Sequence, residues 1–449
     1  MRAPVAVPAG VPGAPGASAA ADPRPVARTL GPAPTLIEIS ELRSGIRLVT
    51  ESMPDVASAS IGVWVGTGSR DETEAQAGIS HFLEHLLFKG TATRSARDIA
   101  EAVDAVGGDM NAYTTKEYTT FYVRALSEHL DLGLDILCDI LREPALRADE
   151  VDAERQVILE EVLMHRDEPA DVVQERFSEA MFPGHQLGRE VLGLPDVIRR
   201  VTVREIRSFF DHHYRPRNMV VAAAGDVTHD VVAKEIERRF VGRKGGKAPR
   251  RVPPQAELRP LTVDRQDTEQ AHLVIGVRSP ARRSPDRFSL AALNHVLGGG
   301  LSSRLFQEVR ETRGLAYSIG SDRVAYEDAG ALSVSVGTAP ENAAEVLGLI
   351  RYEFGELHAG GVTERELEVA KGHLRADLLL SLEDSGARMS RIGASLLLHG
   401  EVLSVEDLLA RIAAVTLTDV AEVASRVLGG SRALAVVGPF DEGDFEADG

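Results

Sequence analysis

The feature that most constrains the fold is a long internal repeat. The stretch VTVREIRSFFDHHYRPRNMVVAAAGDV at 201–227 is echoed by VTLTDVAEVASRVLGGSRALAVVGP at 415–439. Thr202 and Thr416, which stand at corresponding places, are 214 positions apart. A repeat of this length is too long for the unit of a solenoid and indicates tandem duplication of an α+β unit. A chain of 449 residues also exceeds one ordinary core.

We therefore predict an N-terminal domain at 35–242, a linker at 243–260 and a homologous C-terminal domain at 261–449. The linker RKGGKAPRRVPPQAELRP is basic and rich in Gly and Pro. The predicted fold class is α+β, with two α/β-sandwich-like domains forming a clamshell, and a cleft between domains is a favoured place for ligands. Residues 1–34, rich in Ala and Pro, are predicted to be either a disordered tail or the product of a start site placed too early.

Composition excludes several classes of function. The formal net charge of -18 argues against nucleic acid as a partner, because phosphate binding needs basic surface. The single cysteine, Cys138, lies in the apolar helical pattern DLGLDILCDIL, so it is predicted to be a small buried side chain rather than a nucleophile. No apolar run approaches the roughly 20 residues that span a bilayer. We expect a soluble, cytoplasmic protein without a membrane partner.

The strongest chemical signal is the segment HFLEHLLFKGT, which begins at His81. On a helix, His81 and His85 lie about 40° apart, and Glu84 falls within about 100° of both. Two imidazoles at this spacing commonly bind Zn²⁺, and a neighbouring carboxylate can take a proton from metal-bound water. The order H-x-x-E-H is the inverted form of the commoner H-E-x-x-H. The alternative is a helix with two solvated histidines.

A catalytic zinc needs a third protein ligand. Glu154 and Glu161 are two helical turns apart and are predicted to project to one side, together with Val157 and Ile158. Carboxylates on an apolar face are costly unless a cation holds them, and a metal would do so. The spacing alone leaves open which of the two glutamates is the ligand.

These motifs resemble the pitrilysin or insulinase family of zinc peptidases, especially mitochondrial processing peptidase β-subunits and their bacterial homologues. The motifs are HFLEHLLFKGT, NAYT at 111–114 and ERQVILEE at 154–161. The resemblance implies one Zn²⁺ per chain on His81, His85 and Glu161, with Glu84 as the general base. Glu161 is chosen because 75 residues separate it from His85, as the family's third ligand requires. Glu154 then takes a supporting role.

The second half resembles the family's inactive domain. In GGGLSSRLFQEVRETRGLAYSIGS, the resemblance implies that Arg310 and Tyr317 reach the active site from the other domain. The alternative is a solvated helix end and a packed core tyrosine. The counterpart of the metal helix carries only His295, without a second histidine four residues away, and the counterparts of the two glutamates fall near Ala370 and Asp377. No second zinc is therefore expected.

The resemblance also implies a substrate-binding surface. We expect the helix to continue beyond Glu161 to Asp171 and Glu175, whose carboxylates would receive a basic residue before the scissile bond. Phe88 would line the pocket after that bond, and Asn111 of the NAYT motif is a further substrate-binding candidate. The alternative for the two acids is ordinary solvated charge.

The predicted function is a zinc metalloendopeptidase that cleaves extended or unfolded peptides in a cleft between the two domains. The resemblance implies a homodimer or a dimer with a related chain. One alternative is a non-catalytic assembly or partner subunit of the same fold, although such chains lose part of the zinc motif. A zinc hydrolase of small amides is a second alternative, but it would not need Arg310 and Tyr317.

Overall fold

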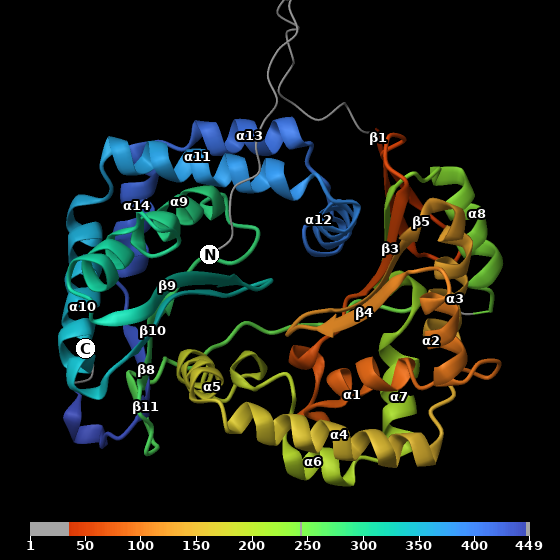
Figure 1. The fold of residues 1–449 in the computed structure, drawn as a ribbon, viewed down its shortest axis with the longest axis horizontal. Helices are drawn as coiled ribbons and strands as arrows, with labels where there is room; N and C mark the ends of the chain where they lie inside the picture. Colours follow the sequence, from red (N-terminus) through yellow and green to blue (C-terminus); the bar gives the residue numbers. More distant parts are fainter. Residues whose placement is uncertain (1–35, 243–244, 446–449) are drawn as a thin grey trace, which may run out of the picture. The chain divides into compact units, whose positions relative to one another are not determined.

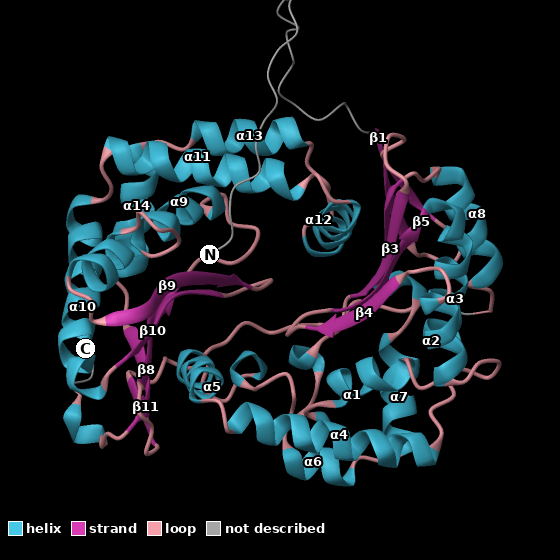
Figure 2. Cartoon of the chain, in the orientation of Figure 1, coloured by secondary structure: helices cyan, strands magenta, loops and turns pink. Residues whose placement is uncertain are grey.

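The computed structural model describes residues 36–242 and 245–445. The predicted tail at 1–34 and the first two residues of the predicted linker lie outside this range. The described chain contains two mixed β-sheets, each with helices packed against it (Figure 1 and Figure 2). The fold is therefore α+β, as predicted.

The first sheet has the strand order β1-β2-β6-β3-β5-β4. Its strands are β1 (Leu36–Glu41), β2 (Arg47–Ser52), β3 (Ser58–Val65), β4 (Asp109–Thr114), β5 (Thr119–Leu126) and β6 (Met219–Gly225). The helices of this half are α1 (Ile79–Leu87), α2 (Ala96–Asp104), α3 (Leu130–Arg142), α4 (Ala148–Arg166), α5 (Pro169–Met181), α6 (Pro195–Arg200), α7 (Val203–His213) and α8 (His229–Arg239).

The second sheet has the order β7-β11-β8-β10-β9. Its strands are β7 (Leu261–Arg265), β8 (Ala271–Arg278), β9 (Ala316–Ala325), β10 (Gly330–Thr338) and β11 (Arg432–Gly438). The helices of this half are α9 (Arg287–Leu297), a π-helical segment η6 (Phe306–Thr312), α10 (Ala343–Gly360), α11 (Glu364–Ser381), α12 (Ser385–Leu398), α13 (Val405–Ala414) and α14 (Leu417–Leu428).

Apart from β1, which has no counterpart in the second sheet, the two sheets share one topology, which confirms the duplication. β2 pairs with β6 in parallel, as β7 pairs with β11, and every other pairing of these strands is antiparallel in both sheets. The repeated sequence covers α7 with β6 and α14 with β11. Thr202 and Thr416 each open their helix with a capping box, in which the carboxylate of Glu205 or Asp419 accepts a hydrogen bond from the backbone N–H of the threonine.

Each half also covers the other half's sheet with one helix. Helix α5 packs on β7, β8 and β11, and α12 packs on β2, β3 and β6. Trp64 of β3 is fully buried in the second of these layers. A Cβ at Gly393 of α12 would lie 2.5 Å from the indole, so the helix approaches this closely because that residue is glycine. The halves are thus joined by two reciprocal apolar layers.

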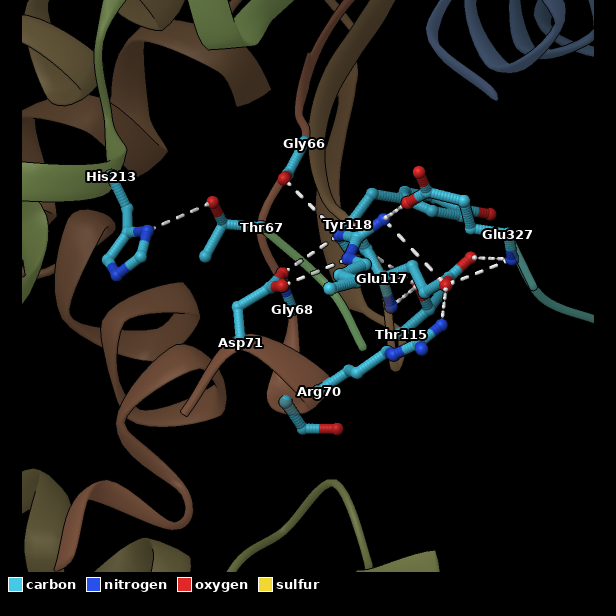
Figure 3. Close-up of polar contacts among 12 residues, drawn as sticks. Gly66, Thr67, Gly68, Arg70, Asp71, Thr115, Glu117, Tyr118, His213 and Glu327 are labelled. Carbon is cyan, nitrogen blue, oxygen red and sulfur yellow. Dashed lines mark hydrogen bonds and ion pairs between the residues drawn. The ribbon is translucent and has the colours of Figure 1, made fainter. Parts of the chain in front are cut away.

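A buried ion cluster adds a polar connection between the halves (Figure 3). Glu117, in the β4–β5 turn, accepts a hydrogen bond from Arg70 at 2.6 Å and from the backbone of Glu327 at 3.1 Å. Arg282, which follows β8, also pairs with Glu117. Burial opposes ionisation of Glu117, but Arg282 and Arg251 outweigh it and hold its pKa below the usual value.

The predicted linker contributes to this cluster. Residues 245–260 form no helix or strand, and Arg251 binds Asp71 at 2.8 Å and Glu327 at 3.2 Å. The boundaries predicted for the two domains and the linker remain predictions.

Two further observations concern the side chain of Cys138 and the apolar character of the helices. Cys138 is buried in α3 as predicted, and burial raises the pKa of its thiol to about 12, so it is a packed side chain rather than a nucleophile. Among the described helices, none combines the length and apolar character that a bilayer crossing requires.

Two expectations about helices are wrong. The helix of Glu161 does not continue to Asp171, because α4 ends at Arg166 and α5 starts at Pro169. Proline disfavours helical geometry in the residue before it, and Glu168 is accordingly extended. Val157 does not share the buried side of α4: it is 50% exposed, whereas Ile158 is fully buried.

Candidate metal centre

Helix α1 places both histidines of the inverted motif on one side. His81 is buried and His85 is half-buried, and their Nε2 atoms lie 3.2 Å apart. Helix α4 runs alongside α1 and brings Glu161 to the same point. Its Oε2 lies 3.7 Å from His81 Nε2 and 3.6 Å from His85 Nε2. The three side chains therefore converge at one point.

The converging atoms fit a zinc ion. Ligands of tetrahedral zinc with bonds of about 2.0–2.1 Å are about 3.3 Å apart, close to the three distances observed. Two imidazole lone pairs and a carboxylate oxygen that face one another repel unless a cation lies between them. Among the described residues, His81, His85 and Glu161 form the group of His, Cys, Asp and Glu side chains with metal-binding geometry.

Glu154 orients His85 rather than joining the triangle. Its Oε1 accepts a hydrogen bond from His85 Nδ1 at 2.8 Å, which leaves the Nε2 lone pair of His85 for a metal. Its Oε2 lies 2.7 Å from the ammonium of Lys89. Burial alone would raise the pKa of Glu154, but the bonds from His85 and Lys89 outweigh it and lower that pKa. Glu154 is thus an ionised, buried partner of His85.

The pKa values of the two histidines are shifted in opposite directions. Burial, followed by the neighbouring His85, lowers the pKa of His81 to about 4, so His81 is neutral at neutral pH. Burial also opposes a charge on His85, but the hydrogen bond that His85 donates to Glu154 and the nearby charge of Glu161 raise its pKa. A metal would replace the positive charge that these carboxylates attract.

Glu84 stands beside the triangle without belonging to it. One of its carboxylate oxygens is buried and has no hydrogen-bond partner among the described residues. Burial raises the pKa of Glu84, and a hydrogen bond from the Thr114 side chain partly offsets that rise. A carboxylate with one free oxygen and a raised pKa is suited to taking up and releasing a proton.

Arg310 and Tyr317 lie together in the C-terminal half. The guanidinium of Arg310, in η6, is 5.1 Å from the ring centroid of Tyr317, in β9. Tyr317 is 83% exposed, so the alternative of a packed core tyrosine is wrong. None of the hydrogen bonds or ion pairs among the described residues joins Arg310 or Tyr317 to the triangle. Their approach to the metal centre remains a prediction.

Comparison with known proteins gives the family. The family described as insulinase (peptidase family M16) matches residues 47–194, and the one described as peptidase M16 inactive domain matches 200–374. A protein of Streptomyces coelicolor described as an uncharacterized zinc protease is 46% identical over 409 residues, which are 89% of each chain. The protein YmxG of Bacillus subtilis, with the same description, is 38% identical over 88% of this chain and 97% of its own.

The chain belongs to the insulinase family, peptidase family M16. A crystal structure of a protease from Helicobacter pylori has a TM-score of 0.83 and 25% identity, and the match covers 90% of this chain and all of that one. The M16 peptidase match includes the triangle, Glu84 and Glu154. The match to the M16 inactive domain includes Arg310 and Tyr317. The resemblance inferred from the motifs is thereby confirmed.

The C-terminal M16 domain has a histidine pair where a second metal helix would be. His295 of α9, which has no histidine four residues away, stacks on His373 of α11 with ring centroids 4.2 Å apart and planes 20° apart. This contact was not expected from the sequence, because His373 comes from another helix and not from one turn further along α9. Stacked rings do not point their nitrogens at one ion, so the pair does not have the geometry of the M16 triangle.

The candidate substrate-binding residues lie on three elements. Asn111 is exposed in β4, the edge strand of the first sheet, and Phe88 is half-buried at the end of α1, 6.0 Å from the ring of Phe121. Asp171 and Glu175 share a face of α5, 3.8 and 3.7 Å from the two ring nitrogens of His165. Glu175 and His165 also line a cavity of about 940 Å³.

Two residues of the site were missed. Lys89 holds Glu154, and its position one turn after His85 was a usable signal, because side chains four residues apart lie on one face of a helix. Thr114 hydrogen-bonds Glu84 and stands in the NAYT motif. That contact depends on how β4 packs against α1, so the local sequence pattern did not reveal it.

Proposed function

We propose that this chain is a zinc-dependent endopeptidase that hydrolyses extended or unfolded peptides. The observation that carries the proposal is the triangle of His81, His85 and Glu161 with the ionisable carboxylate of Glu84 beside it. Zn²⁺ bound there would polarise the scissile carbonyl and acidify water. The names of the zinc proteases of Streptomyces coelicolor and Bacillus subtilis support the same metal and reaction class.

The side chains around the metal site have different roles in the reaction. Glu84 takes a proton from attacking water on its free oxygen and passes it to the leaving amine nitrogen. Glu154, held by Lys89, keeps His85 in the tautomer that leaves Nε2 unprotonated. Because the inner partner of β4 is β5, the outer edge of β4 is available to pair with an extended peptide, and Asn111 lies on this strand. A folded substrate would not offer such a strand.

Variants of Arg310 and Tyr317 test directly whether the C-terminal domain takes part in catalysis. Arg310→Ala and Tyr317→Phe should each lower kcat/KM by about 10²-fold if the two side chains stabilise the developing oxyanion. Peptide hydrolysis and zinc content are measured together, because zinc content should not change. Arg313→Ala, three residues from Arg310 and bound to Glu308 and Glu345, is the matched control. Wild-type rates in both variants would exclude the pair from the site.

The acids of α5 predict a basic preference before the scissile bond. Asp171 and Glu175 put two carboxylates on one helix face, where a guanidinium or ammonium would find complementary charge. The wild-type protein should therefore favour Arg or Lys shortly before the cut and a bulky apolar residue after it, next to Phe88. Mass spectrometry of a cleaved peptide library gives this profile.

The double variant Asp171→Asn with Glu175→Gln should lower the preference for Arg or Lys by about tenfold or more. This is the loss expected when one or two charge-assisted hydrogen bonds are removed. Neutral peptides should be cut as before. Glu179→Gln, on the same helix, is the control. A profile that is unchanged in the double variant would remove these acids from the specificity site.

Other expectations remain proposals. The pairing of two chains, as a homodimer or with a related chain, and a cytoplasmic location rest on the resemblance and on composition. The absence of a nucleic-acid partner is likewise an expectation from the net charge of -18.

A further inference from the structure

A second cavity, of about 340 Å³, lies in the C-terminal half and shares no lining residue with the metal centre. Its lining residues include members of α9, α11, the end of α12, α13 and the last part of β9, and Figure 1 shows where these elements lie in the fold. Most of its wall is apolar, with leucines of α11 and α13 facing Phe288 and Leu290 of α9. Its volume is at the lower end of the range for small-molecule pockets, about 300–1,000 Å³.

Three arginines line this otherwise apolar cavity: Arg282, Arg287 and Arg323. Arg282 is neutralised by Glu117 of the buried ion cluster. Arg323 is exposed and forms no ion pair among the described residues. Arg287 is half-buried, and its polar partner is an imidazole rather than a carboxylate: its Nη1 lies 3.2 Å from His399 Nδ1.

That imidazole does not neutralise the guanidinium. Burial, followed by the charges of Arg287, Arg282 and Arg283, lowers the pKa of His399 to about 4, so the ring is neutral at neutral pH. Glu401 is the one carboxylate in the lining; it is exposed, and its charge acts on Arg287 without forming an ion pair with it among the described residues. A half-buried cation that is not ion-paired with a carboxylate is costly and attracts an anion from solution. This positive site lies in a chain of net charge -18.

We propose that this cavity binds a small monocarboxylate with an apolar chain. The carboxylate pairs with Arg287, and with Arg323 at the rim, while the chain lies between α9, α11 and α13. The apolar wall favours a hydrocarbon over a peptide, because a peptide would bury amide groups without hydrogen-bond partners. The occupant is thus a free aliphatic acid rather than the C-terminus of a protein.

The test is titration calorimetry of the full chain with decanoate below its micelle concentration. We expect saturable binding of one decanoate per chain, at least tenfold tighter than that of decanol or decylamine. Arg287→Gln should weaken binding at least tenfold, because it removes a charge-assisted pair. Ala291→Phe should abolish binding by filling the cavity. Arg283→Gln is the matched control, since Arg283 is exposed and donates to the Leu398 carbonyl outside the lining.

Three results would overturn the proposal: decanol binding as tightly as decanoate, unchanged affinity in Arg287→Gln, or a peptide ending in two leucines binding more tightly than decanoate. The comparison of head groups uses the wild-type protein. It therefore decides the question even if a variant fails to fold.

Discussion

Replacing Glu161 by Ala should remove zinc from the chain and abolish peptide hydrolysis. The carboxylate is one corner of a triangle whose other corners, His81 and His85, are both on α1. Without it, a single helical turn would hold the metal through two imidazoles, and a catalytic site needs three protein ligands. Elemental analysis after dialysis should find one zinc per wild-type chain and almost none in the variant.

Glu160→Ala is the control for this variant. Glu160 is the preceding residue of α4 and is exposed, so its loss changes charge by the same amount without touching the triangle. His81→Ala and His85→Ala should behave like Glu161→Ala. Full zinc occupancy in the Glu161→Ala protein would show that a different side chain completes the site.

Whether the sequence predicts a residue of this site depends on how far apart in the sequence the interacting residues are. Helix geometry alone predicts that His81, Glu84 and His85 lie close together, because residues about one turn apart keep fixed relative positions in any helix. The choice between Glu154 and Glu161 needed the family resemblance, since both are on the same helix at two-turn spacing. The structure distinguishes them physically: the Glu154 side chain is 6% exposed and binds His85 Nδ1, whereas that of Glu161 is 42% exposed and faces both Nε2 atoms.

The duplication was predictable for a similar reason. The repeat contains a capping threonine, an amphipathic helix and a buried strand, and each is specified by local sequence. The exchange of α5 and α12 between the two sheets was not predictable. An apolar helix face such as that of Ile392 and Leu396 is satisfied by any apolar sheet, and the choice between the sheets depends on close fits such as Gly393 against Trp64.

The missed helix break shows that local signals can also be overlooked. Pro169 restricts Glu168 and marks the start of α5, yet the acidic pattern suggested one continuous helix. The consequence for function is the position of His165, which precedes the break and lies between the acids of α5.

Glu84→Gln should retain zinc and lose nearly all turnover. The amide has the size of the carboxylate and can still accept from Thr114, so α1 and the triangle should persist. It cannot take a proton from water, and removal of a general acid–base group typically costs about 10²- to 10⁴-fold. We therefore expect kcat to fall by that factor with one zinc per chain unchanged.

This variant also separates catalysis from a purely structural role of the chain. In an enzyme, Glu84→Gln should still bind a substrate peptide, because the outer edge of β4 and the acids of α5 are intact, and only bond cleavage should fail. Calorimetry with an uncleaved peptide and mass spectrometry of the reaction measure the two steps independently. If the wild-type protein binds zinc and peptide but Glu84→Gln hydrolyses peptides at the wild-type rate, the proton passes through another group. If neither protein cuts any peptide at full zinc occupancy, the chain is a non-catalytic member of family M16.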